Sequence, residues 1–271
     1  MSRCFIFSFI FLLLINPAFS KSYLWLTEKK KDNAAIIKSF GGKILSSSSL
    51  SIGELIHFKA PKQIVGLSGI IEENFQFQTL VSTAPLDIHP KQKSIPMQEL
   101  QWGLENRGNN EPIRTFRRSP VRGVIGADIH ALEAWAITKG SSQIKIAVVD
   151  TGIDITHPNL KQNIWHNLPE QTGTPGVDDD QNGFIDDING WNFVSNNPSV
   201  QDDMGHGTHC AGIIGGKHLK KGIKGVMDRV QLIPVKFLDK KGRGSLEQTI
   251  KAMDYAINLQ PHIINASWGS S

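Results

Sequence analysis

Residues 144–154, IKIAVVDTGID, place an acidic side chain at the end of an apolar run. Within this run, Ile144–Asp150 is apolar apart from Lys145 and the final aspartate, which is typical of a strand buried on both faces of a parallel sheet. Thr151 and Gly152 then favour a sharp turn. Because open α/β sheets bind their ligands at the carboxyl ends of the strands, Asp150 is a candidate functional carboxylate. The alternative is an ordinary acidic residue at a strand end.

From Gly126 onward, strand-like and helix-like segments alternate. After the first strand, the pattern predicts a helix at Gly207–Gly215, a strand at Val230–Leu238, a helix at Ser245–Ile257 and a strand at His262–Ser267. This alternation predicts an α/β fold on a doubly wound parallel sheet. We expect the sheet to be incomplete, with no neighbour covering Val230–Leu238 or His262–Ser267, so that the 271 residues alone fold poorly.

A second informative stretch is residues 205–212, GHGTHCAG. A helix that begins at Gly207 would present His206 at its N-terminal edge, exposed beside the strand ends. Two histidines three residues apart could instead indicate a metal pair, but no further ligands complete a tetrahedral zinc site. His209 falls one turn inside the helix and is expected to pack.

Together, Ala147–Asp154 and Gly205–Gly212 resemble the Asp and His signatures of the subtilisin-like serine protease family, whose catalytic residues occur in the order Asp, His, Ser. The resemblance implies that His206 is the general base and that Asp150 orients it and stabilises its imidazolium form. The family's nucleophile motif, Gly-Thr-Ser followed by a small residue and Pro, does not occur in the sequence, nor does the segment that supplies the oxyanion asparagine. We therefore expect no peptidase activity from these 271 residues alone.

Two further segments resemble the edges between which the family binds an extended polypeptide substrate. They contain the predicted substrate-binding residues Gly242, Arg243 and Gly244 on one edge, and Ser267, Trp268 and Gly269 on the other. Such edges bind mainly the peptide backbone, by strand addition. The alternative is an ordinary strand end and turn. Cys210 is expected to be a small helix residue and no nucleophile, because His206 already has its orienting aspartate.

The N-terminal part carries a β-α-β-β-α-β pattern of the ferredoxin-like kind. Its strand candidates are Tyr23–Thr27, Lys43–Ser47, Glu54–Lys59 and Gly69–Gln78, and its helix candidates are Asp32–Phe40 and Pro61–Leu67. With Glu72-Glu73 near its end, this part resembles the family's propeptide, which implies an intramolecular chaperone and inhibitor. The predicted organisation is a signal peptide at 1–20, the propeptide at 21–80, a linker and processing region at 81–125, and the N-terminal part of the catalytic domain at 126–271.

The first twenty residues predict export. Arg3 precedes the apolar run Phe5–Ile15, and small residues follow at Pro17–Ser20, as in a cleavable signal peptide; an uncleaved membrane anchor is the alternative. We expect a secreted monomer with no membrane contact after cleavage. The net charge of +4 is scattered over the chain, which indicates no nucleic-acid partner. Loss of Cys4 with the signal leaves Cys210 without an intrachain disulfide.

An acidic loop, DDDQNGFIDD at residues 178–187, follows the calcium-loop pattern of oxygen ligands at alternate positions with glycine at the sixth. The predicted calcium ligands are Asp178, Asp180, Asn182, the carbonyl of Phe184, and Asp186 directly or through water. Asn189 stands where the pattern has a bidentate glutamate, so the affinity is lower or Asp187 substitutes. The alternative is a solvated acidic turn.

Three functions fit these patterns. The first is a secreted subtilisin-like endopeptidase of which these residues are the N-terminal part. The second is a non-catalytic product in which residues 22–80 inhibit a related protease, and the third is a calcium-dependent binding protein on a decayed protease scaffold.

Overall fold

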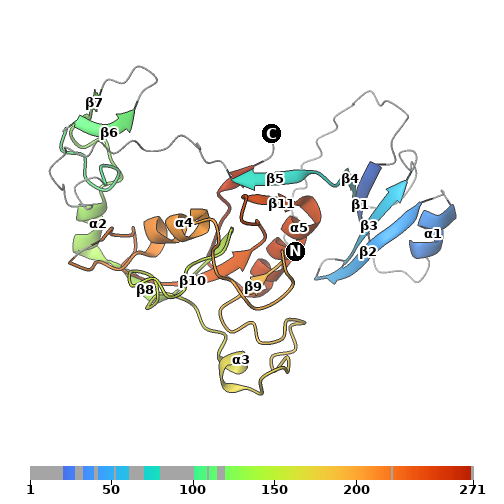
Figure 1. The fold of residues 1–271 in the computed structure, drawn as a ribbon. Coiled ribbons are helices and arrows are strands. Elements are labelled where there is room, and N and C mark those ends of the chain that lie inside the picture. Colours follow the sequence, from blue (N-terminus) through green and yellow to red (C-terminus); the bar gives the residue numbers. More distant parts are fainter. Residues whose placement is uncertain are drawn as a thin grey trace, which may run out of the picture. The chain divides into compact units, whose positions relative to one another are not determined.

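The computed structural model describes residues 21–27, 33–39, 42–51, 53–60, 70–79, 101–108, 110–114, 120–220 and 222–269 (Figure 1). The chain divides into two compact units, Met1–Asn74 and Phe75–Ser271. The predicted signal peptide and most of the predicted linker lie outside the described residues. Within the described residues, no helix combines the length and the apolar composition needed to cross a membrane.

The first unit contains an antiparallel sheet with the strand order β2-β3-β1-β4. Its elements are β1 (Lys21–Thr27), α1 (Asn33–Ser39), β2 (Lys43–Leu50), β3 (Gly53–Ala60) and β4 (Ile70–Glu73). This order is that of the predicted ferredoxin-like pattern, whose second helix, at Pro61–Leu67, lies outside the described residues. Alternate residues of the strands pack on α1, and the core consists of Tyr23, Trp25, Ile37, Ile56, Phe58 and Ala60.

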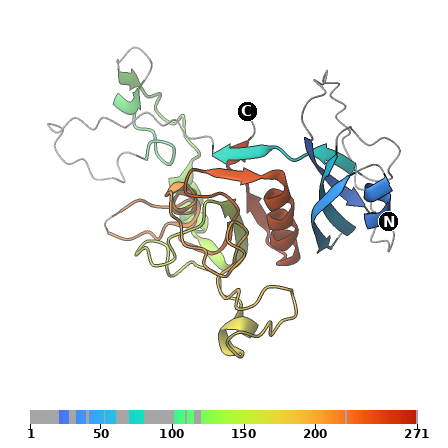
Figure 2. The ribbon, with the colours of Figure 1, turned by 45° about the vertical axis from the view of Figure 1, so that its right-hand side comes forward.

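The predicted last strand of this unit, Gly69–Gln78, is in fact two strands. β4 ends at Glu73, and β5 (Gln76–Thr79) belongs to the second unit. There β5 pairs antiparallel with both β11 (Arg243–Ser245) and β13 (Trp268–Gly269), as the cyan and orange-red strands in Figure 2 show for β5 and β11. The change of partner explains the break, because a single straight strand cannot belong to both sheets.

The main sheet of the second unit has the order β12-β8-β10-β9 with every pair parallel. Its strands are β12 (Ile263–Asn265), β8 (Gly140–Asp150), β10 (Arg229–Lys236) and β9 (Trp191–Asn192), joined through α4 (His206–Gly215) and α5 (Leu246–Asn258). A capping box begins α5, in which Ser245 and Gln248 bond each other's backbone N–H groups. The predicted α/β fold with a parallel sheet is confirmed.

The two faces of this sheet form two separate cores, as expected for strands whose side chains alternate between faces. Ala147 and Val149 of β8 pack with Tyr255 of α5 on one face. Ile146 and Val148 pack with Ala211 of α4 on the other. The helices therefore cover opposite faces, and the carboxyl ends of β8 and β10 lie between them.

Two expectations are corrected, one about the sheet and one about the predicted linker. Val230–Leu238 does have neighbours, because β10 lies between β8 and β9 and every residue of Leu232–Leu238 except Pro234 and Lys236 is a buried apolar side chain. Only the expectation for β12 holds in the described residues, where it is an edge strand and Ile263 is 54% exposed. The predicted linker at 81–125 also contains a hairpin, β6 (Asn110–Arg114) and β7 (Pro120–Arg122), which lacks the apolar alternation by which strands are recognised.

The remaining helices are short. They are α2 (Ala131–Ile137), which precedes β8, and α3 (Leu168–Thr172), which precedes the acidic loop.

Candidate active site

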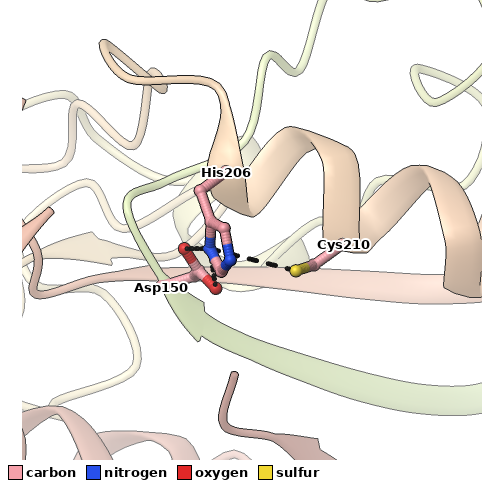
Figure 3. Close-up of side chains that lie close together, drawn as sticks. All are labelled: Asp150, His206 and Cys210. Atoms are coloured by element: carbon pink, nitrogen blue, oxygen red, sulfur yellow. Dashed lines mark hydrogen bonds and ion pairs between the residues drawn. The ribbon is translucent and has the colours of Figure 1, made fainter. Parts of the chain in front are cut away.

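Asp150 and His206 form a hydrogen-bonded pair at the carboxyl end of β8 (Figure 3). His206 Nδ1 lies 2.8 Å from Asp150 Oδ1 and 3.0 Å from Oδ2. Asp150 is fully buried, and its Oδ1 also accepts a 2.7 Å bond from the Thr151 N–H. Since the carboxylate accepts at Nδ1, that nitrogen carries the proton, which leaves Nε2 as the basic nitrogen.

A glycine allows α4 to approach the Asp150 turn this closely. A Cβ on Gly207 would lie 2.1 Å from Gly152 O and 3.1 Å from Asp150 Cβ. In place of a side-chain contact, the Gly207 N–H donates a 2.9 Å bond to Thr151 Oγ1. The small residues of the histidine motif thus set the spacing between the two elements that carry the pair.

Asp202 was not indicated by the sequence pattern, yet it organises the turn that leads into His206. Its Oδ1 accepts from Thr151 Oγ1 and from the N–H groups of Met204 and Gly205, and its Oδ2 accepts from the N–H and hydroxyl of Thr208. Burial by itself would raise the pKa of Asp202, but the bonds from Thr208, Gly205 and Met204 outweigh it and hold the pKa below its ordinary value. The only sequence signal was an acidic residue shortly before a predicted helix.

Cys210 lies one turn after His206, with its Sγ 4.0 Å from His206 Nδ1 (Figure 3). Burial and the negative charge of Asp150 raise the pKa of this thiol, which disfavours the thiolate that a nucleophile requires. The geometry thus gives no support for a nucleophilic Cys210. The expectation that His209 packs is wrong, because its side chain is exposed on α4.

The two segments predicted as substrate edges flank a strand of the chain itself. In the register of β5, Gly244, Arg243 and Gly242 face Phe77, Gln78 and Thr79 on one side, with a 3.0 Å bond from Thr79 N to Gly242 O. On the other side Trp268 and Gly269 face Thr79 and Gln78. Ser267, the remaining residue of the predicted substrate edges, directly precedes β13. Its Oγ accepts a 3.0 Å bond from Asn265 Nδ2.

Aromatic packing anchors the β5 segment to these edges. The ring centroid of Phe77 lies 4.9 Å from that of Trp268 in an edge-to-face arrangement, and Phe237 lies 5.0 Å from Trp268 on another side. Trp268 is itself fixed, because its Nε1–H donates a 2.9 Å bond to Val149 O of β8. Phe77 therefore packs against a tryptophan whose indole is held in place by a hydrogen bond to β8.

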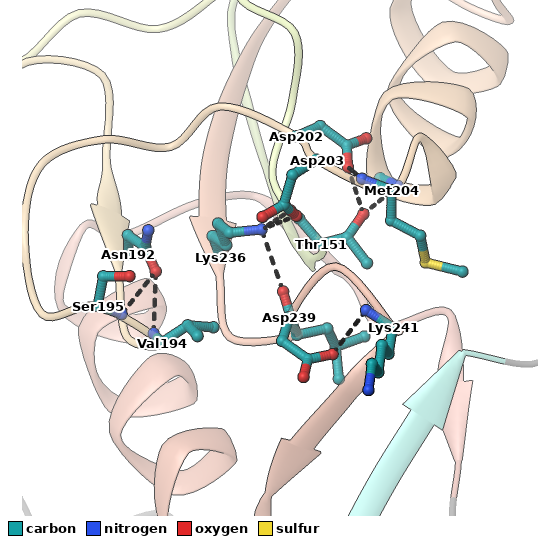
Figure 4. Close-up of polar contacts among 12 residues, drawn as sticks. Thr151, Asn192, Val194, Ser195, Asp202, Asp203, Met204, Lys236, Asp239 and Lys241 are labelled. Carbon is teal, nitrogen blue, oxygen red and sulfur yellow. Dashed lines mark hydrogen bonds and ion pairs between the residues drawn. The ribbon is translucent and has the colours of Figure 1, made fainter.

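A buried lysine bonds to Thr151, the residue that follows Asp150 (Figure 4). Lys236, the last residue of β10, is 3% exposed. Its Nζ donates to Thr151 O, to Asp203 Oδ1 at 2.7 Å and to Leu238 O at 3.2 Å. The sequence pattern had counted this residue only as part of an apolar strand.

The acidic loop is folded around its own carboxylates. Asp178 accepts from the N–H groups of Asn182 and Gly183, the Asn182 side-chain oxygen accepts from Phe184 N–H, and Asp186 accepts from Gly176 N–H. Of the predicted ligands, only Asp180 belongs to a tight carboxylate group, which contains Glu170, Asp180 and Asp187 with one oxygen of each within 4.8 Å of the others.

Glu170 was not predicted, because it lies on α3, outside the loop pattern. Glu170 and Asp187 are 3% and 0% exposed, and no lysine or arginine of the described residues pairs with any of the three acids. Burial raises the pKa of Asp187 to about 6, although bonds from Tyr255, Asn167 and Asn182 partly oppose this. Three neighbouring carboxylates without a lysine or arginine partner among the described residues offer oxygen ligands that fit a hard cation such as Ca²⁺.

Comparison with known proteins shows which family the part of the chain that carries this pair resembles. Residues 141–271 match the model of the subtilase family. Over 132 residues the chain is 45% identical to subtilisin-like protease 1 of Plasmodium berghei (strain Anka), which corresponds to 48% of this chain and 22% of that protein. It is 34% identical over 137 residues to the thermophilic serine proteinase of Bacillus sp. (strain AK1), or 50% of this chain and 28% of that protein.

Among solved structures, the chain resembles the Aeromonas sobria serine protease in its complex with a chaperone, with 26% identity and a TM-score of 0.47 over 65% of this chain and 26% of that one. The chain thus spans about a quarter of the length of these relatives. The predicted relationship to the subtilisin-like serine proteases is confirmed.

Proposed function

We propose that this chain, whose residues 141–271 are of the subtilase family, is part of a secreted serine endopeptidase and supplies the Asp-His half of its catalytic triad. The observation that carries the proposal is the hydrogen bond between buried Asp150, at the end of a parallel strand, and partly exposed His206. The pair lies next to paired strand edges that already hold an extended peptide segment. An acidic residue at an ordinary strand end would have neither a histidine bonded to it nor peptide-binding strand edges beside it.

In this mechanism His206 Nε2 takes the proton of a serine hydroxyl as that oxygen attacks the substrate carbonyl, and later returns it to the leaving amine. Asp150 keeps the other nitrogen protonated and stabilises the imidazolium. The 271 residues contain no Gly-Thr-Ser motif, so the full-length product of the gene is the proper material for activity measurements. We expect that product to hydrolyse casein and to react with a fluorophosphonate, and the 271-residue polypeptide to do neither. A full-length product that is inert in both assays would contradict the proposal.

We also propose that the segment before the catalytic domain acts as an intramolecular inhibitor. Support comes from β5, since Gln76–Thr79 directly follows the four-stranded unit in sequence and occupies both edges where a substrate strand would bind. Phe77 supplies the side-chain anchor through its contact with Trp268. A substrate cannot enter while this segment stays in place.

Replacing Phe77 with Ala is expected to loosen this segment. Loss of a partly buried aromatic contact costs about 2 kcal/mol, so the Thr79 amide should exchange with deuterium roughly 30-fold faster. Hydrogen exchange of the intact chain measures this directly. Gln78→Ala is the matched control, because Gln78 lies on the same strand and its side chain is exposed. In this variant, exchange of the Thr79 amide should not change by more than a few-fold. Equal protection of Thr79 in the Phe77 variant would contradict the proposed anchor.

Calcium is proposed as the structural ion of the acidic loop. Glu170, Asp180 and Asp187 would be its carboxylate ligands, and Asp178, Asn182, the Phe184 carbonyl and Asp186 are the loop oxygens expected from the sequence. The ion would supply the positive charge that the described surroundings of these acids lack. Its role here is to order the loop, with no part in the reaction.

Calcium removal is expected to lower the thermal midpoint by roughly 5 °C or more, because an ion that binds only the folded state stabilises it by about 2–3 kcal/mol at 100-fold excess over its Kd. Scanning calorimetry with Ca²⁺ and with EDTA measures the shift. Glu170→Gln should remove most of it, whereas Glu133→Gln, an exposed acid on α2, should leave it intact. Identical midpoints with and without calcium would exclude the site.

A further inference from the structure

Lys236 carries a full charge into the interior, at the end of a strand whose other side chains are mostly apolar. Burial of an ammonium is costly unless hydrogen-bonding partners replace its water. Its three acceptors come from three different segments. Thr151 O lies in the turn after β8 and Asp203 Oδ1 in the turn before α4 (Figure 4). Leu238 O lies in the connection to β11. Each of these segments adjoins a part of the proposed active site.

We infer that Lys236 is a positioning residue, whose side chain fixes the Asp150–His206 geometry by tying these three segments together at one point. The inference rests on the proposed function of the pair. Lys236 bonds neither to a reacting atom nor to the imidazole, so it acts through the backbone of one partner and the preceding turn of the other.

On the Asp150 side, Lys236 and the two residues that follow β10 bond two successive carbonyls. Asp150 O accepts from Phe237 N at 3.0 Å and from Leu238 N at 3.3 Å, and Thr151 O accepts from Lys236 Nζ. The same Thr151 holds the carboxylate through its N–H and holds the start of α4 through its hydroxyl. If the lysine were lost, Thr151 O would lose the hydrogen bond from Lys236 Nζ, and the residue that bonds both members of the pair would be less constrained.

On the His206 side, the ion pair with Asp203 fixes the residue next to Asp202. Asp202 organises the first turn of α4 through its bonds to Gly205 and Thr208. Asp203 Oδ1 lies 2.7 Å from the Lys236 ammonium, and the Asp203 side chain is 51% exposed. Two adjacent carboxylates therefore hold the turn before His206. The carboxylate of Asp202 bonds to Thr151, and that of Asp203 bonds to Lys236.

The third hydrogen bond of Lys236, to Leu238 O, connects it to the predicted substrate-binding edge at Gly242–Gly244. Leu238 O accepts from Lys236 Nζ immediately before the turn in which Asp239 N bonds Arg243 O and Gly242 N bonds Asp239 O. This turn delivers Gly242–Gly244 to the side of β5. One ammonium thus links the positions of the acid, the base and a peptide-binding edge.

The test measures how fast the Nδ1 proton of His206 exchanges with water, by NMR of the chain with isotope-labelled histidine. Lys236→Met keeps the length and removes the charge, and should speed this exchange at least roughly tenfold. Asp203→Asn should speed it in the same direction by a smaller factor. The control is Lys217→Met, because Lys217 also pairs with an aspartate and donates to a backbone carbonyl, at Asp228, and it should leave the exchange unchanged.

Unchanged exchange in a folded Lys236→Met variant would overturn the inference, as would an equal rise in Lys217→Met. If Lys236→Met does not fold, Asp203→Asn decides, because its exposed side chain can be replaced without disturbing the core; an unchanged rate there would overturn the inference. The readout needs neither a serine nor a substrate. Failure of the peptidase assay would therefore contradict the proposed function and leave this test standing.

Discussion

Replacement of His206 with Ala should lower kcat/KM of the full-length product by about 10⁶-fold, close to the loss of all triad chemistry. The reason lies in the pair's geometry, because no other described base lies beside Asp150 and the nearby Cys210 thiol has a raised pKa. Asp150→Asn should cost about 10⁴-fold, since the amide would hold the imidazole in the wrong tautomer. Hydrolysis of a chromogenic peptide at saturating and limiting concentrations measures both.

His209→Ala is the matched control for this experiment. His209 lies on the same helix, three residues further on, and its side chain is exposed. It should retain activity within about twofold, because exposed substitutions away from special contacts are nearly neutral. Comparable losses in the two histidine variants would mean that the helix, and not the base, accounts for the effect, and would contradict the assignment of His206.

Replacement of Gly207 with Ala should destabilise the chain by about 3 kcal/mol or more and separate His206 from Asp150. The new Cβ would lie 2.1 Å from Gly152 O, which is backbone and cannot rotate away. Either α4 or the turn after β8 must shift, and both carry a member of the pair. Urea denaturation gives the change in stability, and loss of the protected His206 Nδ1 proton signal reports the separation.

Gly103→Ala provides the comparison, because a Cβ there meets nothing within 4 Å. Its stability should change by less than about 0.5 kcal/mol. If Gly207→Ala were equally mild and kept the imidazole signal, close approach of α4 to the Asp150 turn would not be the reason for the glycine.

The parts of the fold that could be predicted are those with a local cause. The composition of Ile144–Asp150 predicts a doubly buried strand, and the small residues after His206 predict a closely packed helix. The pairing of Asp150 with His206 follows from the resemblance of their two motifs to those of the subtilisin-like proteases. The order of the sheet in the N-terminal unit followed in the same way from the alternation of its strands and helices.

The parts that could not be predicted depend on partners far away in sequence. Nothing in Gln76–Thr79 shows that it leaves one sheet for another whose strands begin at Arg243 and Trp268. Lys236 reads as an interruption in an apolar strand until its acceptors are known. Glu170 joins the acidic group from a short helix, whereas the loop pattern concerns only neighbours in sequence.

The pairing of β5 with both edges has a consequence for competition. A strand attached to the same chain meets its edges at an effective concentration of about millimolar for a short flexible connection, whatever the concentration of the protein. A free peptide of equal intrinsic affinity must exceed that value to displace it. Once the connection is cleaved, the same strand binds as a separate molecule, and dilution alone then favours its dissociation. Control over access to these edges thus depends on chain continuity more than on any individual contact.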